Sequence, residues 1–430
     1  MRTQIEFEVA DIEKFKKQLL FWSENFSQIA YLDSNNISQK YSSFDAILAV
    51  DSFTSIQSDY YGAFDKLHSY YHTTKDWIFG YLTYDLKNDL EQLSSNNPDL
   101  LQFEEIFFFQ PKKIFFIKGN RVTATYLNLV SDEMDTDINE IKQVVIPSGI
   151  PQTSIELSPR INKKAYFEKF EQIKKYLAQG EIYEVNFCMD FFSENVQINP
   201  LHIFDSLNEL TQSPFSAFFR NQNHYAMCGS PERYLKKDGK KIISQPIKGT
   251  SKRFQNPELD SQSKAQLLSD PKERSENIMI VDLVRNDLSA TAAPSSVCVE
   301  ELCQVYSYKQ VHQLISTITS RLKEGISPIE VLKDSFPMGS MTGAPKISAM
   351  KIIEKIEESK RGLYSGAIGY FDPNENFDFN VVIRSVLYNS DNQTVSYSVG
   401  SAITSKSDAE KEYSECLIKA EAMLKSLNKA

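Results

Sequence analysis

Short runs of strand-forming residues alternate with amphipathic helices through much of this 430-residue chain. The runs are rich in β-branched and aromatic residues, as strands are. They include HYAMC (224–228), KKIIS (240–244), YSGAIGYF (364–371), FNVVIRSVLY (379–388) and VSYSVGSAIT (395–404). A helix is predicted over 162–180, where Tyr166 and Phe170 belong to one apolar stripe that ends at Gly180. With no fixed-period repeat in the mixture, we predict an α+β fold.

A proline-containing stretch, residues 144–160, is the best candidate for an internal boundary. We therefore predict an N-terminal region over 1–150 that packs into the same layered fold, and a catalytic region over 155–430. No motif in the N-terminal region indicates chemistry.

The chain carries more acidic than basic residues, which disfavours some classes of binding partner. The net charge is −10, and no stripe of Lys and Arg could neutralise a run of phosphates, so nucleic acid is not expected. No apolar segment is long enough to cross a bilayer, and no secretory signal is visible, so no membrane partner is expected. The five cysteines form no CxxC pair and indicate reduced thiols, which predicts a cytoplasmic protein.

Two glutamates lie three residues apart in the stretch 269–290. Asp270 and Pro271 are typical of a helix start, and Glu273 fits a capping box with Asp270. Glu276 has no such explanation. Like charges at this spacing repel unless a cation or a base lies between them.

The C-terminal helix repeats this spacing with Glu412 and Glu415. For this pair alone, an ordinary surface ion pair between Glu415 and Lys419 is the favoured interpretation. Two such pairs in one chain nevertheless suggest a site for Mg²⁺, which favours one or two carboxylates together with water and substrate oxygens.

Two further features suggest that anions bind. The loop from Gly339 to Pro345 leads into a helix, whose first N–H groups can bind an anion, although an ordinary loop explains the pattern as well. Arg384 lies inside an apolar strand-like run and needs a carboxylate partner from the protein or from a ligand. These features suggest a small, doubly anionic substrate.

Lys248 follows strand residues and precedes Gly249 and Thr250. This order is wrong for a Walker A loop. A solvated lysine at the end of a strand is the commoner case, and the position alone leaves both a solvated lysine and a site lysine open.

Six motifs, taken in order, resemble those of the chorismate-utilising enzyme family: PIKGT (246–250), ENIMIVDLVRND (276–287), GSMTGAPK (339–346), GLYSGAIGYF (362–371), IRS (383–385) and EYSECLIKA (412–420). The family includes the large subunits of anthranilate synthase and aminodeoxychorismate synthase, and the isochorismate and salicylate synthases. The resemblance covers roughly residues 160–428. It implies an α/β/β/α layered fold like that of anthranilate synthase component I, with two antiparallel sheets and a cleft for chorismate and Mg²⁺.

PIKGT resembles the aminodeoxychorismate synthase branch, whereas anthranilate synthases look like PIAGT. On this resemblance, Lys248 is a covalent nucleophile and Glu232 is the general acid for the leaving C4 hydroxyl. A nucleophilic lysine must be neutral, so its pKa is expected to be lowered, while the pKa of Glu232 is expected to be raised. From the residues alone, Glu232 would instead pair with Arg233 or nearby lysines at the surface.

The resemblance also implies a set of binding residues. They are Glu276 and Glu415 as direct Mg²⁺ ligands, Glu273 and Glu412 as ligands through water, Arg384 and Tyr364 for substrate carboxylate, Thr342 of the GSMTGAPK motif, and backbone contacts to chorismate from Gly249, Thr250 and the turn Gly400, Ser401 and Ala402. His312 would lie near the reacting ring, with a core histidine as its plainer interpretation.

The chain departs from the family pattern at Glu184, and it shows no glutaminase motif. Glu184 stands where amine-transferring members usually carry glutamine and water-using members carry lysine, and it could bind ammonium or tune Lys248. No glutaminase motif is visible, so ammonia is expected from a separate glutaminase subunit or from solution. The alternatives are an anthranilate synthase large subunit, against which Lys248 argues, and a non-catalytic chorismate-binding subunit.

Overall fold

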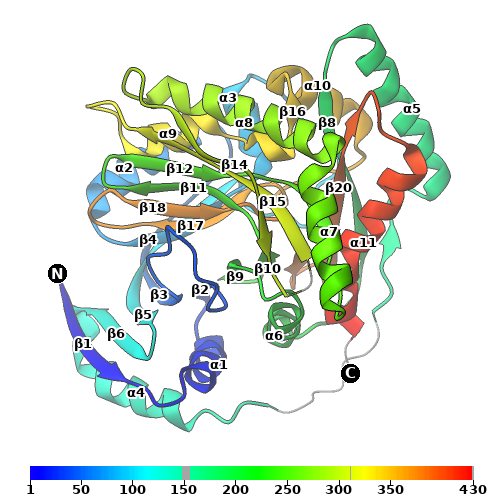
Figure 1. The fold of residues 1–430 in the computed structure, drawn as a ribbon. Helices are drawn as coiled ribbons and strands as arrows, with labels where there is room; N and C mark the ends of the chain where they lie inside the picture. The colour runs from blue at the N-terminus through cyan, green and yellow to red at the C-terminus, as the bar shows by residue number, and fades with distance from the viewer. Residues whose placement is uncertain (148–154, 310, 429–430) are drawn as a thin grey trace.

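The computed structural model describes residues 1–147, 155–309 and 311–428 (Figure 1). Its strands form two antiparallel sheets. The order in sheet 1 is β1 (Arg2–Glu8), β6 (Arg121–Leu127), β5 (Ile106–Lys118), β3 (Ala46–Ser58), β2 (Gln28–Asp33), β9 (Phe215–Asn221), β10 (His224–Ser230), β19 (Ser385–Asn389), β20 (Thr394–Thr404) and β8 (Glu184–Ser193). The short strands β7 (Ser158–Pro159) and β16 (Gly343–Ala344) pair with β8.

Sheet 2 begins from the same strand β5. Its order is β5, β4 (Ile78–Leu82), β17 (Ala367–Phe371), β18 (Phe377–Asn380), β11 (Arg233–Asp238), β12 (Lys241–Gln245) and β15 (Val311–Arg321). Beyond the end of β12, β13 (Ile247–Lys252) continues along β15, and β14 (Cys298–Ser307) also pairs with β15. Since β5 belongs to both sheets, the first 147 residues take part in both.

Helices cover the outer faces of the sheets. Their bounds are α1 (Ile12–Trp22), α2 (Ala63–Thr74), α3 (Lys87–Leu90), α4 (Met134–Gln143), α5 (Lys163–Gln179), α6 (Pro200–Thr211), α7 (Pro257–Ser269), α8 (Pro271–Thr291), α9 (Pro328–Ser335), α10 (Lys346–Ile356) and α11 (Ala409–Asn428), with short 3₁₀ turns at η1 (Ser23–Asn25), η2 (Tyr84–Leu86), η3 (Asn128–Glu133) and η4 (Gly339–Met341). In the part of the chain that the structure describes, no helix has the length and apolar character needed to span a membrane.

Two hydrophobic cores separate these layers. Along β9, Phe218 belongs to the core that sheet 1 shares with α1, α4, α5, α6, α10 and α11. Its neighbours Ala217 and Phe219 belong to the core between the sheets and beneath α2, α8 and α9. Successive strand residues point to opposite faces, so one strand contributes to both cores. The result is the predicted α/β/β/α arrangement.

The predicted helix over 162–180 is confirmed as α5. The Asn162 side chain accepts a hydrogen bond from the backbone N–H of Ala165 at 2.9 Å, and Gly180 ends the helix with a φ of 76°. Part of the predicted boundary, residues 148–154, lies outside the described residues.

Candidate active site

A cavity of about 1080 Å³ opens where β13, α8, α11 and β20 converge. Most of the residues singled out from the sequence line it: Glu232, Lys248, Gly249, Thr250, Glu273, Glu276, Tyr364, Arg384, Gly400, Ala402, Glu412 and Glu415. The chain brings them together from segments nearly two hundred residues apart, so their shared location is a property of the fold.

Lys248 lies in β13 and is buried with a carboxylate partner. Its Nζ donates to Glu184 Oε1 at 2.8 Å, and the two side chains are 10% and 1% exposed. Burial alone lowers the pKa of Lys248, but the carboxylates of Glu184 and Glu276 outweigh burial and raise it. The pKa of Lys248 is therefore raised, whereas the sequence predicted that it would be lowered. The reason is that the carboxylates of Glu184 and Glu276 lie close enough to stabilise the charged ammonium form.

The backbone beside Lys248 requires glycine. Gly249 has a φ of 97°, and a Cβ there would lie 3.0 Å from Glu273 Oε2. Both facts disfavour a side chain at this position. The missing side chain lets β13 pass close to the first turn of α8.

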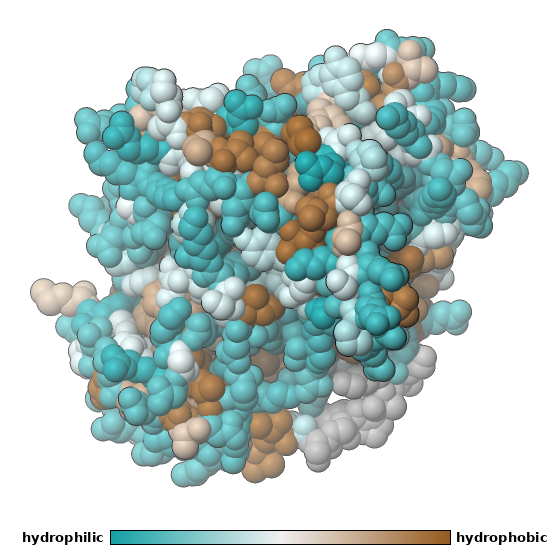
Figure 2. Space-filling view, in the orientation of Figure 1, coloured by the Kyte–Doolittle hydropathy of each residue, from teal (hydrophilic) through white to brown (hydrophobic). Residues whose placement is uncertain are grey.

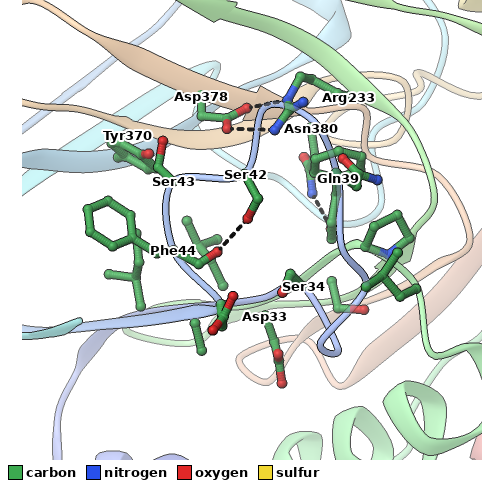
Figure 3. Close-up of a pocket in the computed structure, with 18 of the residues that line it drawn as sticks. Asp33, Ser34, Gln39, Ser42, Ser43, Phe44, Arg233, Tyr370, Asp378 and Asn380 are labelled. Carbon is green, nitrogen blue, oxygen red and sulfur yellow. Dashed lines mark hydrogen bonds and ion pairs between the residues drawn. The ribbon is translucent and has the colours of Figure 1, made fainter. Parts of the chain in front are cut away.

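Glu232 is buried just before β11. Burial raises its pKa to about 7, although a hydrogen bond from Ser340 and the charge of Lys248 act in the opposite direction. Surface pairing with Arg233 does not occur. Arg233 is itself buried and instead forms a two-point contact with Asp378, at 2.9 and 3.0 Å (Figure 3).

Arg233 also forms part of a second, smaller pocket of about 80 Å³ beneath the loop from Ser34 to Asp45 (Figure 3). Its guanidinium donates to the Tyr41 carbonyl at 3.2 Å and to Gln245 Oε1 at 2.6 Å. These contacts fix the start of β11, and therefore the backbone that carries Glu232.

Four glutamates from two helices line the cavity, with lysines between them. Lys272 Nζ lies 3.0 Å from Glu412 Oε1 and 3.7 Å from Glu276 Oε1. Lys419 Nζ lies 2.6 Å from Glu415 Oε1, the ion pair favoured from the sequence. Burial raises the pKa of Glu276 to about 8, with Lys248 acting against it.

The donors present fit a hard divalent cation. Glu276 is buried, and its Oε1 makes no hydrogen bond to the described residues. Carboxylate oxygens are the ligands Mg²⁺ prefers, and two are enough when water and substrate complete the shell. Within residues 1–147, 155–309 and 311–428, however, no three His, Cys, Asp or Glu side chains are gathered closely enough to hold a metal by themselves.

Arg384 lies at a break between strands. The predicted strand over 379–388 ends at Asn380 and resumes at Ser385, and Arg384 has a left-handed φ of 50°. Among the described residues, its guanidinium has no hydrogen-bond or ion-pair partner, and burial lowers its pKa while Glu232 opposes the shift. An unpaired guanidinium in a cavity favours an anionic ligand.

Comparison with models of known protein families identifies the family of this chain. The model for the chorismate binding enzymes matches residues 27–425. The chain belongs to the chorismate-binding enzymes.

Known proteins agree with this assignment. Aminodeoxychorismate synthase component 1 of Bacillus subtilis (strain 168) is 31% identical over 360 residues, which are 81% of this chain and 76% of that protein. The probable chloroplastic aminodeoxychorismate synthase of Oryza sativa subsp. japonica is 38% identical over 290 residues, or 65% of this chain. This chain matches only 32% of the length of the rice protein.

A solved structure confirms the fold. Anthranilate synthase component I from Streptococcus pneumoniae TIGR4 superposes with a TM-score of 0.77 at 24% identity, covering 90% of this chain and 93% of that one. At this identity, the likeness establishes the fold alone.

Not every predicted residue of this chorismate-binding enzyme lines the cavity. His312 is buried against α7, where its Nε2 lies 3.1 Å from Asp260 Oδ1 and its Nδ1 lies 2.8 Å from Ser307 Oγ. Thr342 is fully buried in the loop after η4, and its hydroxyl donates to backbone carbonyls. Gly400, Ser401 and Ala402 lie within β20 and do not form the expected turn. Gly400 and Ala402 line the cavity, whereas Ser401 does not.

Sequence reasoning also missed residues that support the cavity. Arg361 is buried, and it donates to the carbonyls of Met341 and Asn186 at 2.7 and 2.8 Å and to Glu357 Oε1 at 2.7 Å. It thereby ties η4 to β8 beside the cavity. An unexplained arginine in a strand of apolar neighbours was the signal for Arg384, but Arg361 follows a charged segment and gave no such signal.

Proposed function

We propose that this chain is the chorismate-converting subunit of an aminodeoxychorismate synthase, which replaces the C4 hydroxyl of chorismate with an amino group derived from ammonia. The observation that carries the proposal is Lys248, a buried lysine in the wall of the cavity. Among the described residues, Glu184 is the one carboxylate at hydrogen-bond distance from its amine. The names of the Bacillus and rice relatives support the same activity.

Chorismate is a dianion, and the cavity offers charge for it. Arg384 lies in the cavity wall, and no ion-pair partner is seen for its guanidinium among the described residues, so it binds one carboxylate in this proposal. Tyr364 lies in the same wall. Glu276 and Glu415 lie in the same wall and would hold a metal ion for the second carboxylate.

The substitution is proposed in two displacements. The Lys248 amine adds at C2 as both ring double bonds shift by one position, and the C4 hydroxyl leaves as water with the proton of Glu232. Ammonia then adds at C4, both double bonds return to their original positions, and the lysine leaves C2 as an amine. The balance is chorismate plus ammonia giving 4-amino-4-deoxychorismate and water, with the configuration at C4 retained.

Lys248 must lose a proton before it attacks, because its raised pKa leaves it charged in the free protein. Glu184, 2.8 Å away, is the nearest acceptor for that proton. Glu232 has the complementary property, since a pKa of about 7 leaves a substantial protonated fraction at neutral pH.

Mg²⁺ is proposed as the cofactor. Glu276 and Glu415 would hold it directly, and Glu273 and Glu412 through water, once Lys272 and Lys419 give up their present partners. When bound, the metal supplies positive charge to a substrate carboxylate.

The amine donor is ammonia, supplied by a separate glutaminase subunit or taken from solution. The printed name "component 1" of the Bacillus relative supports a second component. We place the reaction in the cytoplasm, as the odd and scattered set of cysteines suggests. An anthranilate synthase activity is disfavoured by Lys248.

A product assay tests the proposal. Purified protein is incubated with chorismate, MgCl₂ and an ammonium salt at mildly alkaline pH, and the products are identified by mass spectrometry. We expect 4-amino-4-deoxychorismate without pyruvate. Anthranilate together with pyruvate would overturn the assignment, as would binding of chorismate without any turnover.

A further inference from the structure

Gln313 presents an unused amide to the cavity. It lies in β15 next to His312, but on the opposite face of the strand, so its side chain lines the cavity while His312 packs against α7. Gln313 is 1% exposed, and its Oε1 is buried without a hydrogen-bond partner in the part of the chain that the structure describes. A buried amide oxygen in this condition is uncommon and needs an explanation.

The strand register places Gln313 beside β13, the strand that carries Lys248. Thr250 pairs with Gln313, and Ile247 pairs with Ile315, with an irregularity in β13 between the two pairs. Residues that pair directly point to the same face, so Gln313 shares the cavity face of β13. Asn277 Nδ2 donates to the carbonyls of Lys248 and Leu314, at 3.3 and 3.1 Å, and holds the two strands together there.

The chemistry of the ligand limits what can satisfy this oxygen. Chorismate carries two carboxylates and an enol ether oxygen, and all of these accept hydrogen bonds. Its C4 hydroxyl is its one O–H donor. An acceptor such as Gln313 Oε1 therefore has a single strong partner on this substrate.

We propose that Gln313 accepts a hydrogen bond from the C4 hydroxyl of chorismate and selects for a ring that carries a donor at this position. The inference rests on the proposed function. Glu232 would donate its proton to the hydroxyl oxygen while the hydroxyl proton is held by Gln313, so the leaving group is contacted by both. The amino group of the product is also a donor, so the same contact fits substrate and product.

The test compares two ligands in two proteins by calorimetry. The ligands are chorismate and its analogue without the C4 hydroxyl, in buffer with MgCl₂ and without ammonium. The proteins are Lys248→Ala and Lys248→Ala/Gln313→Leu, because the first change prevents reaction with the ring during titration. We expect Lys248→Ala to bind chorismate at least tenfold more tightly than the analogue, and the Gln313→Leu change to reduce this ratio below threefold.

A matched control uses the same substitution on the neighbouring strand. Gln304 is exposed on β14, and Gln304→Leu should leave the ratio of affinities unchanged. If Gln313→Leu does not fold, Gln313→Met gives the same comparison with a closer shape. A tenfold ratio that persists after Gln313 is replaced would overturn the inference alone. Absence of chorismate binding to Lys248→Ala would overturn the proposed function as well.

Discussion

At the scale of single residues, burial acts in opposite directions on acids and bases in the same cavity. It raises the pKa of Glu232 to about 7 and that of Glu276 to about 8, because the charged carboxylate is poorly solvated there. On Lys248 burial lowers the pKa, and only the nearby carboxylates reverse the outcome. The site therefore holds a protonatable acid beside a charged lysine, and both must change protonation state during the proposed reaction.

The pH dependence of activity follows from Glu232. Its protonated form is the acid, and that form disappears as the pH rises through about 7, so kcat/KM should fall on the alkaline side of this value. Glu232→Gln should lower kcat by about 10²–10⁴-fold and remove this limb of the profile. The profile is measured at saturating ammonia, with the concentration of free NH₃ held constant. If kcat/KM of Glu232→Gln still falls above pH 7 as in the wild type, Glu232 is not the group that causes this fall.

Glu276 controls the metal requirement in this account. Glu276→Gln removes one negative ligand, so the Mg²⁺ concentration for half-maximal activity should rise at least tenfold. The control is Asp282→Asn on the same helix, where the carboxylate is exposed and pairs with Arg285 at 2.7 Å. Equal Mg²⁺ requirements in the two variants would contradict the assignment of Glu276 as a ligand.

Sequence alone could find some of these residues and not others. Glu276 stood out because its charge had no local explanation, and Arg384 because of its apolar neighbours. Gln313 could not be found, because the choice between it and His312 depends on which face of β15 meets the cavity. That face is set by pairing with β13, which lies about sixty residues earlier in the chain.

At the scale of elements, the start of α8 positions the acidic side of the cavity. Asp270 accepts hydrogen bonds from the backbone N–H groups of Lys272 and Glu273, at 2.8 and 3.1 Å, and Pro271 occupies the first turn. The sequence predicted this cap. At the C-terminal helix, Ser407 and Glu410 have the spacing of a capping box in the sequence. In the structure, the Asp408 carboxylate instead accepts a hydrogen bond from the backbone N–H of Lys411. Ser and Asp are both good caps, so adjacent candidates cannot be separated by pattern.

Removal of the α8 cap should affect both stability and metal binding. Asp270→Ala is expected to lower the free energy of unfolding by about 1 kcal/mol. It should also raise the Mg²⁺ concentration needed for half-maximal activity, because the first turn of α8 carries Glu273. Asp11→Ala at the start of α1 is the matched control, since Asp11 caps its helix in the same way and does not line the cavity. Thermal unfolding and Mg²⁺ titration of both variants check this. Similar kinetics for the two would contradict a role for this cap in the site.

At the scale of the whole molecule, the N-terminal and C-terminal segments share their sheets. β2 pairs with β9 in sheet 1, and β4 pairs with β17 in sheet 2. Gly80 of β4 pairs with Gly369 of β17. A Cβ at Gly80 would lie 2.1 Å from the Phe107 carbonyl oxygen, so the close packing there requires glycine. These pairings join distant parts of the chain. Local patterns predicted a mixture of helices and strands, and the family resemblance implied the layers, but the patterns could not show which strands lie side by side.

The catalytic region should therefore not fold by itself. A fragment of residues 155–430 would expose β9 and β17 as unpaired strand edges with apolar faces, which favours aggregation. We expect it to be insoluble, or to lack a cooperative thermal transition, and to be rescued by co-expression with residues 1–154. A soluble fragment with the chorismate affinity of the full chain would show that the two regions are independent domains.

The most direct test of the central claim is the mass of the intact protein after brief incubation with chorismate and MgCl₂ in the absence of ammonium, followed by acid quenching. If Lys248 is the nucleophile, part of the wild-type protein gains the mass of one chorismate less one water. Peptide mapping then places the addition on Lys248, and Lys248→Ala gains nothing. An addition that persists in Lys248→Ala, or 4-amino-4-deoxychorismate formed by that variant at the wild-type rate, would contradict covalent catalysis by this lysine.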